Sequence, residues 1–201
     1  MADVIPVDED QLRVEIQKHY AEVASHPEHE FHFHTGRQAA RQVGYESSTI
    51  DDLPDGVIAS FAGVANPFYY GLPKPGETVL DVGSGVGVDA IIAARAVGPK
   101  GRVIGVDMTP EMLEVARHNS DRMGFSNIEF REGLVERLPV DAESVDLVIS
   151  NGVLNLTVDK HGAYRQIARA LKSGGRFQIA DICVDKPVSD ESKRNIDLWT
   201  G

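Results

Sequence analysis

The spacing of apolar residues changes near Glu77, and the two parts of the chain predict different structures. After Glu77, short apolar runs alternate with longer stretches in which apolar residues recur every three or four positions. The runs predict buried strands and the longer stretches predict helices, an alternation typical of a parallel sheet covered by crossover helices. The predicted strands are Glu77–Val82, Arg102–Asp107, Ile128–Arg131, Val145–Ser150 and Gly175–Ile182, and the predicted helices are Val88–Val97, Pro110–Met123 and His161–Leu171.

The part before Glu77 predicts helices only. Asp10–Val23 has the pattern of an amphipathic helix, and Gly36–Gly44 and Pro54–Ala62 predict shorter ones. Three prolines then predict an extended link, because each removes a backbone donor and restrains the residue before it. We therefore expect residues 1–73 to form a helical cap and linker over the ligand site of a domain at residues 74–201.

Two of the predicted helices carry clear boundary residues. Thr109 suits the N-cap position, Pro110 the first helical position and Glu111 the first turn. Gly174 and Gly175 can stop the third helix and turn the chain into the last strand, since glycine adopts the left-handed conformation easily.

The composition narrows the choice of partners. The 201 residues are 42% hydrophobic and carry a formal net charge of -11, which suits one main α/β domain and disfavours nucleic acid or an anionic membrane surface as a partner. Cys183 is the one cysteine, the acidic start of the chain has no secretory-signal pattern, and no apolar run approaches about 20 residues. We expect a cytoplasmic protein that acts on a small molecule.

The strongest chemical signal is a glycine-rich junction after the first predicted strand. The strand runs into Gly83-Ser84-Gly85-Val86-Gly87 and then into a helix, so these glycines lie at the carboxyl edge of the sheet, where open α/β sheets bind ligands. Asp81 precedes the junction, and Asp107 ends the next strand. A carboxylate at that position can accept hydrogen bonds from both hydroxyls of a ribose.

Four motifs in order carry a family resemblance. DVGSGVG begins at Asp81, GVDM at Gly105, EG with LP at Glu132 through Pro139, and LKSGG at Leu171. Together they resemble the class I S-adenosylmethionine-dependent methyltransferases over about residues 74–184. The resemblance implies a Rossmann-like parallel sheet with flanking helices and strand order 3-2-1-4-5. That family has seven strands, so we expect the final two to be missing here and the fifth strand to have an unpaired edge.

The resemblance also implies the cofactor and its contacts. The glycine loop would lie along the methionine part of S-adenosylmethionine, Asp107 would hold the ribose, and Met108 would pack on the adenine. The implied cofactor-binding residues are Asp81, Gly83, Ser84, Gly85, Gly87, Asp107, Met108, Leu134, Val135, Glu136 and Asn151.

A nicotinamide-dependent dehydrogenase is the alternative with the same architecture. Its fingerprint places a third glycine where this chain has Val88. Tyr164 has Ala168, not lysine, four positions on, and the pair Tyr70 and Lys74 precedes the first strand. The residues therefore favour the methyltransferase.

A narrower resemblance points to the arsenite methyltransferases. GVANP at Gly63, KPGE at Lys74 and SNGVLNL at Ser150 are similar to that group, which usually has cysteines at the positions of Val64 and Gly152. Arsenic(III) is a soft centre held by thiolates, and Cys183 alone cannot supply three of them. We expect the scaffold without the metalloid chemistry.

The acceptor side is less defined. We expect an enzyme that methylates a small molecule; a cofactor-binding module that works through a partner is the alternative, and a homodimer is one possible assembly. His26, His29, His32 and His34 fit no closed structural metal site, so no metal is expected. No residue is identified as the catalytic base, and the acceptor-side candidates are His32, His34, Tyr69, Tyr70 and Asn151.

Overall fold

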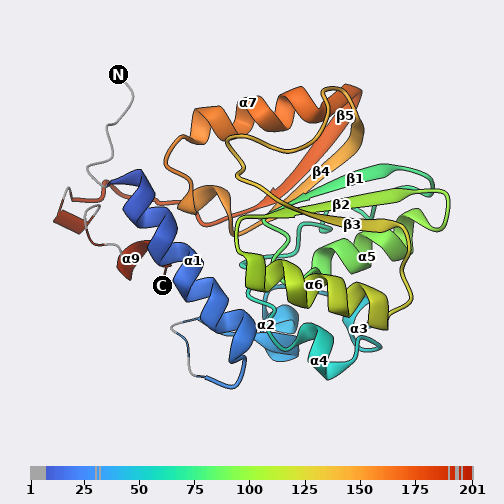
Figure 1. The fold of residues 1–201 in the computed structure, drawn as a ribbon, viewed down its shortest axis with the longest axis horizontal. Coiled ribbons are helices and arrows are strands. Elements are labelled where there is room, and N and C mark those ends of the chain that lie inside the picture. Colours follow the sequence, from blue (N-terminus) through green and yellow to red (C-terminus); the bar gives the residue numbers. More distant parts are fainter. Residues whose placement is uncertain are drawn as a thin grey trace.

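A parallel sheet lies at the centre of the structure, a computed structural model that describes residues 8–29, 31, 33–189, 191–192, 195 and 197–200. All strand pairings within the described residues are parallel, and the order is β3-β2-β1-β4-β5 (Figure 1). The order implied by the family resemblance is thereby confirmed. The strands are β1 (Thr78–Val82), β2 (Arg102–Asp107), β3 (Ile128–Glu132), β4 (Val145–Asn151) and β5 (Leu171–Ala180).

Helices cover both faces of the sheet because successive strand residues point to opposite sides. Val79 and Leu147 belong to the core that α5 (Val88–Val97) and α6 (Pro110–Arg122) close. Leu80 belongs to the core beneath α7 (Lys160–Ala170), which lies on the other face in Figure 1. The three predicted crossover helices are therefore confirmed.

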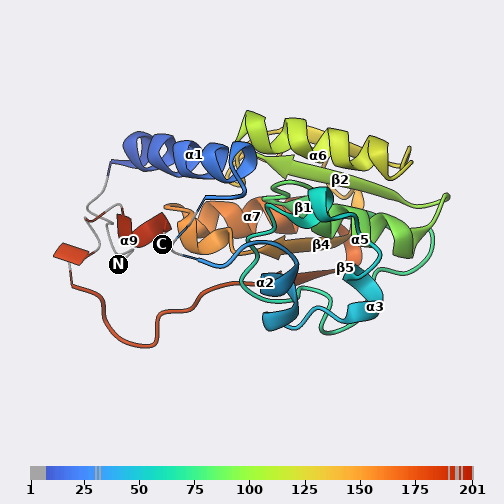
Figure 2. The same ribbon diagram turned by 90° about the horizontal axis from the view of Figure 1, so that it is seen from below.

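The N-terminal helices share a core with α5. They are α1 (Glu9–Ser25), α2 (Gly36–Gln42), α3 (Ser47–Ile50) and α4 (Asp55–Ile58). Figure 2 shows α1 beside α6, and buried Val23, Ile50 and Ile58 belong to the same apolar cluster as Ile91. The predicted helix at Pro54–Ala62 is too long, because the chain leaves the helix at Ile58 and the carbonyl of Phe61 accepts the Gly36 N–H.

The junction between α7 and β5 differs from the prediction. The helix ends at Ala170 and the strand begins at once at Leu171, which pairs with Val145, whereas Gly175 was the predicted start. An irregularity follows, with Gly174 at φ 79°, before Arg176 pairs with Leu147. The glycines thus form a bulge inside the strand rather than the turn before it.

Two short elements complete the described chain. A 3-10 helix, η1 (Leu154–Leu156), follows β4, and α9 (Asp197–Thr200) lies near the C-terminus. Thr109 occupies the N-cap position of α6, as predicted, although its side chain makes no capping hydrogen bond. Within the described residues, no helix is both long enough and apolar enough to cross a membrane.

The outer edge of β5 has no strand neighbour among the described residues. It pairs only with β4, and Phe177 at its middle is 56% exposed. One contact reaches it from the N-terminal part, where Gln178 Nε2 donates to the carbonyl of Gly71 at 3.1 Å. An open strand edge beside exposed apolar surface favours association with another chain.

We predict that this edge makes the chain self-associate. Phe177→Lys should weaken the association, since a charge on an edge strand opposes pairing, while Tyr164→Lys on α7 should not. Sedimentation across a concentration series measures the association, and amide exchange reports protection of β5. A stable monomer whose outward-facing β5 amides exchange slowly would contradict this prediction.

Candidate functional site

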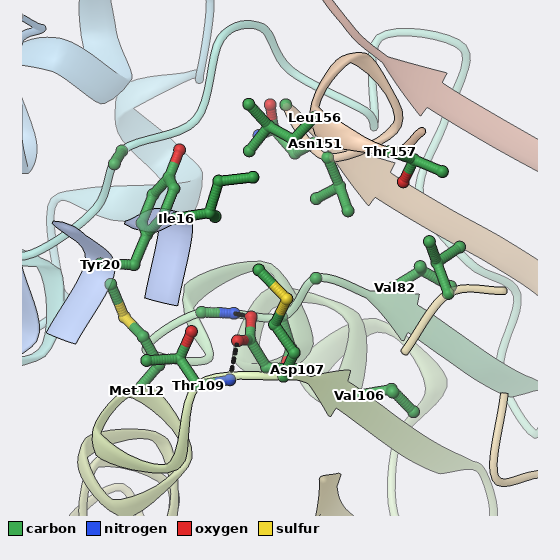
Figure 3. Close-up of a pocket in the computed structure, with 18 of the residues that line it drawn as sticks. Ile16, Tyr20, Val82, Val106, Asp107, Thr109, Met112, Asn151, Leu156 and Thr157 are labelled. Carbon is green, nitrogen blue, oxygen red and sulfur yellow. Dashed lines mark hydrogen bonds between the residues drawn. The ribbon is translucent and has the colours of Figure 1, made fainter. Parts of the chain in front are cut away.

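A pocket opens at the carboxyl edge of the sheet, where the chain order reverses between β1 and β4 (Figure 3). Ligands of open α/β sheets bind at such a reversal because the loops after the two strands diverge there. We call it the sheet-edge pocket. Its lining includes Gly83, Ser84, Gly85, Asp107, Met108, Leu134, Val135, Glu136 and Asn151.

The glycine loop contains two positions, Gly83 and Gly87, at which a side chain would collide with a neighbouring residue. Gly83 has φ 71°, and a Cβ there would lie 2.1 Å from Cγ2 of Val153. At Gly87 a Cβ would lie 2.9 Å from Cζ of Phe130. Gly85 has φ 49° but meets nothing closer than 3.9 Å, so its face is open toward the pocket. The loop therefore presents bare backbone to a ligand.

Asp107 ties the loop to the end of β2. Its Oδ2 accepts the Gly85 N–H and its Oδ1 accepts the Thr109 N–H, each at 2.9 Å (Figure 3). Burial raises the pKa of Asp107, and the backbone N–H donors counteract part of that rise. Each carboxylate oxygen keeps a further acceptor position, so Asp107 can still bind a pair of hydroxyls.

Asp81 lies behind the loop rather than in the pocket lining. It is buried, and its Oδ2 has no hydrogen-bond partner among the described residues. Burial and the neighbouring carboxylates of Asp89 and Asp107 raise its pKa well above the usual range. Protonation relieves the cost of holding this group in a dry position.

A buried network joins Asp89 of α5 to Tyr45 and Asn151. Tyr45 Oη donates to Asp89 Oδ1 at 2.5 Å, and Asn151 Nδ2 lies 3.1 Å from Asp89 Oδ2 and 3.0 Å from Tyr45 Oη. Asn151 Oδ1 accepts the Val64 N–H at 2.9 Å. Burial raises the pKa of Asp89 to about 6, and burial beside that carboxylate raises the pKa of Tyr45. The Asn151 amide thus anchors the loop around Val64.

Helix α1 supplies a wall of the pocket, and none of its residues was among the sequence-derived site candidates. Leu12, Ile16 and Tyr20 line it, and Gln17 Nε2 donates to the Met108 carbonyl at 2.7 Å. Arg13 pairs with Glu136 at 3.3 Å. The spacing of four between Leu12, Ile16 and Tyr20 puts them on one helix face, which was the available signal.

The sequence-derived candidates fall into different places. Two of the implied cofactor residues, Asp81 and the α5 N-cap Gly87, are not among the residues that line the pocket. The other implied cofactor residues line it. Tyr69 and Tyr70 are 79% and 88% exposed and line neither this pocket nor the neighbouring one, so their acceptor-side role stays a prediction. His32 lies outside the described residues. His34 lines the neighbouring pocket.

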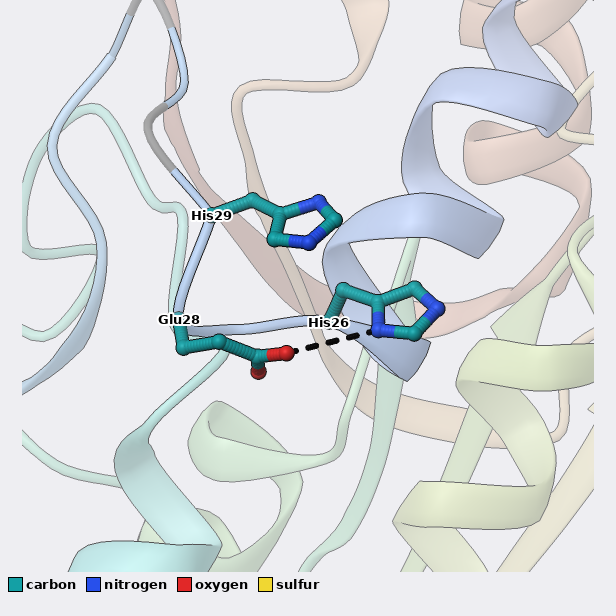
Figure 4. Close-up of side chains that lie close together, drawn as sticks. All are labelled: His26, Glu28 and His29. Atoms are coloured by element: carbon teal, nitrogen blue, oxygen red, sulfur yellow. Dashed lines mark hydrogen bonds and ion pairs between the residues drawn. The ribbon is translucent and has the colours of Figure 1, made fainter.

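Three side chains after α1 come close enough to share an ion. His26, Glu28 and His29 have potential ligand atoms within 4.8 Å of one another (Figure 4). All three are exposed, His26 Nδ1 lies 3.4 Å from Glu28 Oε1, and none lines the sheet-edge pocket. The expectation that the protein needs no metal remains a prediction.

Comparisons with family models, curated proteins and solved structures all match this chain to methyltransferases. The model of the methyltransferase domain family matches residues 73–200. An arsenite methyltransferase from Halobacterium salinarum is 42% identical over 167 residues, which are 83% of this chain and 42% of that protein. The chain thus spans less than half the length of this relative.

Solved structures agree. An arsenic(III) S-adenosylmethionine methyltransferase from Chlamydomonas reinhardtii has a TM-score of 0.64 at 38% identity, covering 72% of this chain and 51% of that one. A phosphoethanolamine N-methyltransferase from Haemonchus contortus, solved with phosphomonomethylethanolamine and S-adenosylhomocysteine, has a TM-score of 0.58 at 26% identity. That likeness covers 66% of this chain and 31% of the other.

The buried network generates a test on stability. Tyr45→Phe removes the hydrogen bond that stabilises ionised Asp89, so the free energy of unfolding at pH 7 should fall by about 1–3 kcal/mol. The folded-state pKa of Asp89 is raised from 3.8 to about 6, so the wild-type protein loses stability between these values, where the unfolded chain has released the proton and the folded protein still holds it. Without the Tyr45 donor the folded-state pKa of Asp89 should rise further, so the variant should go on losing stability above pH 6 and its deficit should grow as pH rises through 6.

Urea unfolding at several pH values measures this deficit. Tyr164→Phe, at a residue on α7 that is 46% exposed, is the control and should change little. A Tyr45→Phe deficit that is the same at pH 4.5 and pH 7.5 would contradict the role given to Asp89.

Proposed function

The chain belongs to the methyltransferase domain family and its cofactor is S-adenosylmethionine, and on this premise we propose that it is an enzyme that methylates a small molecule. The main support is the position of Asp107, whose two oxygens are fixed by backbone donors beside an open glycine loop. That arrangement suits a ribose next to a ligand chain lying along bare backbone.

The residues around the sheet-edge pocket suit the cofactor part by part. Asp107 would accept the ribose hydroxyls, and the open face of Gly85 leaves room for the methionine part. Met108, Leu134 and Val135 offer apolar surface to the adenine ring. Because α1 contributes Ile16 and Tyr20 to the same wall, it would shield the bound cofactor from water.

When bound, S-adenosylmethionine would supply a methyl group on a sulfonium sulfur. An acceptor lone pair would bond to the methyl carbon as the carbon–sulfur bond broke with its electrons left on sulfur, and the acceptor would release its proton to solvent. The task of the chain is alignment and exclusion of solvent, since such a displacement is in line. The loop that Asn151 anchors forms one side of the pocket, so it would help to set the direction of approach. Of the acceptor-side candidates, we retain His34 as a contact with the acceptor.

The direct test is turnover. The chain is incubated with S-adenosylmethionine and a panel of metabolites, and S-adenosylhomocysteine is measured. Acceptor-dependent product supports the enzyme. Tight cofactor binding with no product for any acceptor class would favour the alternative, a binding module that works through a partner.

We predict that Asp107→Ala weakens binding of S-adenosylhomocysteine by about 2–4 kcal/mol, because two charge-assisted hydrogen bonds are lost. Asp107→Asn keeps one acceptor oxygen and should lose less. Calorimetry measures both, with Asp121→Ala on the exposed side of α6 as the control. Unchanged affinity in Asp107→Ala would show that this carboxylate does not hold the ribose.

Arsenite should be a poor substrate of this chain. Val64 and Gly152 stand where the resembling group usually has cysteines, and Cys183 is exposed and lines neither pocket. A soft ion then has no preorganised thiolate site. Product analysis with arsenite, cofactor and a reducing thiol tests this expectation, and steady formation of methylated arsenic would prove it wrong.

A further inference from the structure

The end of α1 carries a group of side chains that takes no part in the cofactor site. His26 is the C-cap residue of α1, and Glu28 and His29 belong to the turn that follows. Figure 4 shows the three side chains gathered beside the end of the helix. None of them lines the sheet-edge pocket, so a ligand that they bind lies outside the cofactor site.

The backbone brings the two histidines together. The His26 N–H donates to the Glu22 carbonyl at 2.8 Å, and the His29 N–H donates to the His26 carbonyl at 3.0 Å. The two rings are stacked, with their centroids 4.8 Å apart and an angle of 9° between their planes. This turn therefore holds two imidazoles side by side, and imidazole nitrogen is a preferred ligand of zinc.

A carboxylate of α1 already orients one of these imidazoles. Glu22 Oε1 lies 3.1 Å from His29 Nδ1. An ionised carboxylate can only accept, so Nδ1 carries the hydrogen and the lone pair of a neutral His29 lies on Nε2. A carboxylate behind a histidine ligand is a common feature of metal sites, where it fixes the tautomer and the direction of the ring.

Glu28 adds an oxygen to the two imidazoles. Its Oε1 lies 3.4 Å from His26 Nδ1, and the potential ligand atoms of all three residues lie within 4.8 Å of one another. A tetrahedral zinc ion holds its ligand atoms about 3.4 Å apart, so the widest separation must shrink by about 1.4 Å. Since all three side chains are exposed, they can rotate by this amount without disturbing the core.

The charge at this end of α1 favours a cation. The last turn of α1 contains no basic residue to compensate the negative end of the helix dipole. Glu22 and Glu28 place two carboxylates at the same position. A divalent cation there is attracted by the helix end and by both carboxylates.

We propose that His26, Glu28 and His29 bind a zinc ion, that Glu22 positions His29, and that the ion fastens the end of α1 to the turn after it. Water completes the coordination, as in other sites with three protein ligands. The ion takes no part in methyl transfer. The proposal departs from the sequence-based expectation of no metal, because that expectation considered the histidines without Glu22 and Glu28.

Calorimetric titration of the full chain with zinc chloride tests the proposal. Every protein in the series carries Cys183→Ser, because an exposed thiol is itself a zinc ligand. One ion should bind per chain, with a dissociation constant on the order of micromolar. Magnesium chloride should give no measurable binding, since Mg²⁺ prefers oxygen ligands and keeps its waters. Zinc should also slow amide exchange at His29, whose N–H closes the turn.

Single substitutions identify the ligands. His26→Ala and His29→Ala should each weaken zinc binding about tenfold or more, because each removes one of three ligands. Glu22→Gln should weaken it by a smaller factor, since an amide oxygen still accepts the Nδ1 hydrogen but carries no charge. His118→Ala is the matched control, at an exposed histidine on α6, and should leave zinc binding unchanged.

The proposal is overturned if zinc does not bind, if magnesium binds as tightly, or if His26→Ala or His29→Ala keeps the affinity of the Cys183→Ser protein. Urea unfolding without zinc checks that each variant is folded. The variants should match the Cys183→Ser protein in that measurement, because the substituted side chains are exposed.

Discussion

The two hydrogen bonds that Asp107 accepts fix the geometry on which the site depends. They join the end of β2 to Gly85 of the glycine loop and to Thr109 at the start of α6. The bond to Thr109 is local, whereas the bond to Gly85 spans 22 residues, so one carboxylate holds the remote glycine loop against the junction of β2 and α6. Because backbone N–H groups hold both oxygens, the carboxylate is oriented before any ligand arrives, and preorganisation reduces the entropy lost on binding.

The sheet makes this junction possible and also imposes a cost. The reversal between β1 and β4 opens the pocket, yet it places the carboxylates of Asp81, Asp89 and Asp107 close together in a dry region. The structure offsets this with the donors of Tyr45 and Asn151 on Asp89 and with the raised pKa of Asp81. The same Asn151 contacts hold the loop around Val64, so charge compensation and pocket shape depend on one side chain.

Much of this architecture was predictable from the sequence, because strand and helix periods are local and the glycine loop is a local motif. The strand order came from the family resemblance and is confirmed. The start of β5 was not predictable, since the pairing of Leu171 with Val145 overrides the turn tendency of Gly174. The long-range contacts could not be predicted either. No local pattern shows that the Gln17 side chain donates to the Met108 carbonyl or that the Asn151 amide donates to Asp89.

The central claim is that the sheet-edge pocket is built for S-adenosylmethionine rather than for a dinucleotide. Calorimetric titration of the full chain with S-adenosylhomocysteine and, separately, with NAD tests it most directly. The account predicts binding of S-adenosylhomocysteine with a dissociation constant on the order of micromolar and no measurable binding of NAD. Equal affinity for the two ligands, or binding of NAD alone, would contradict it.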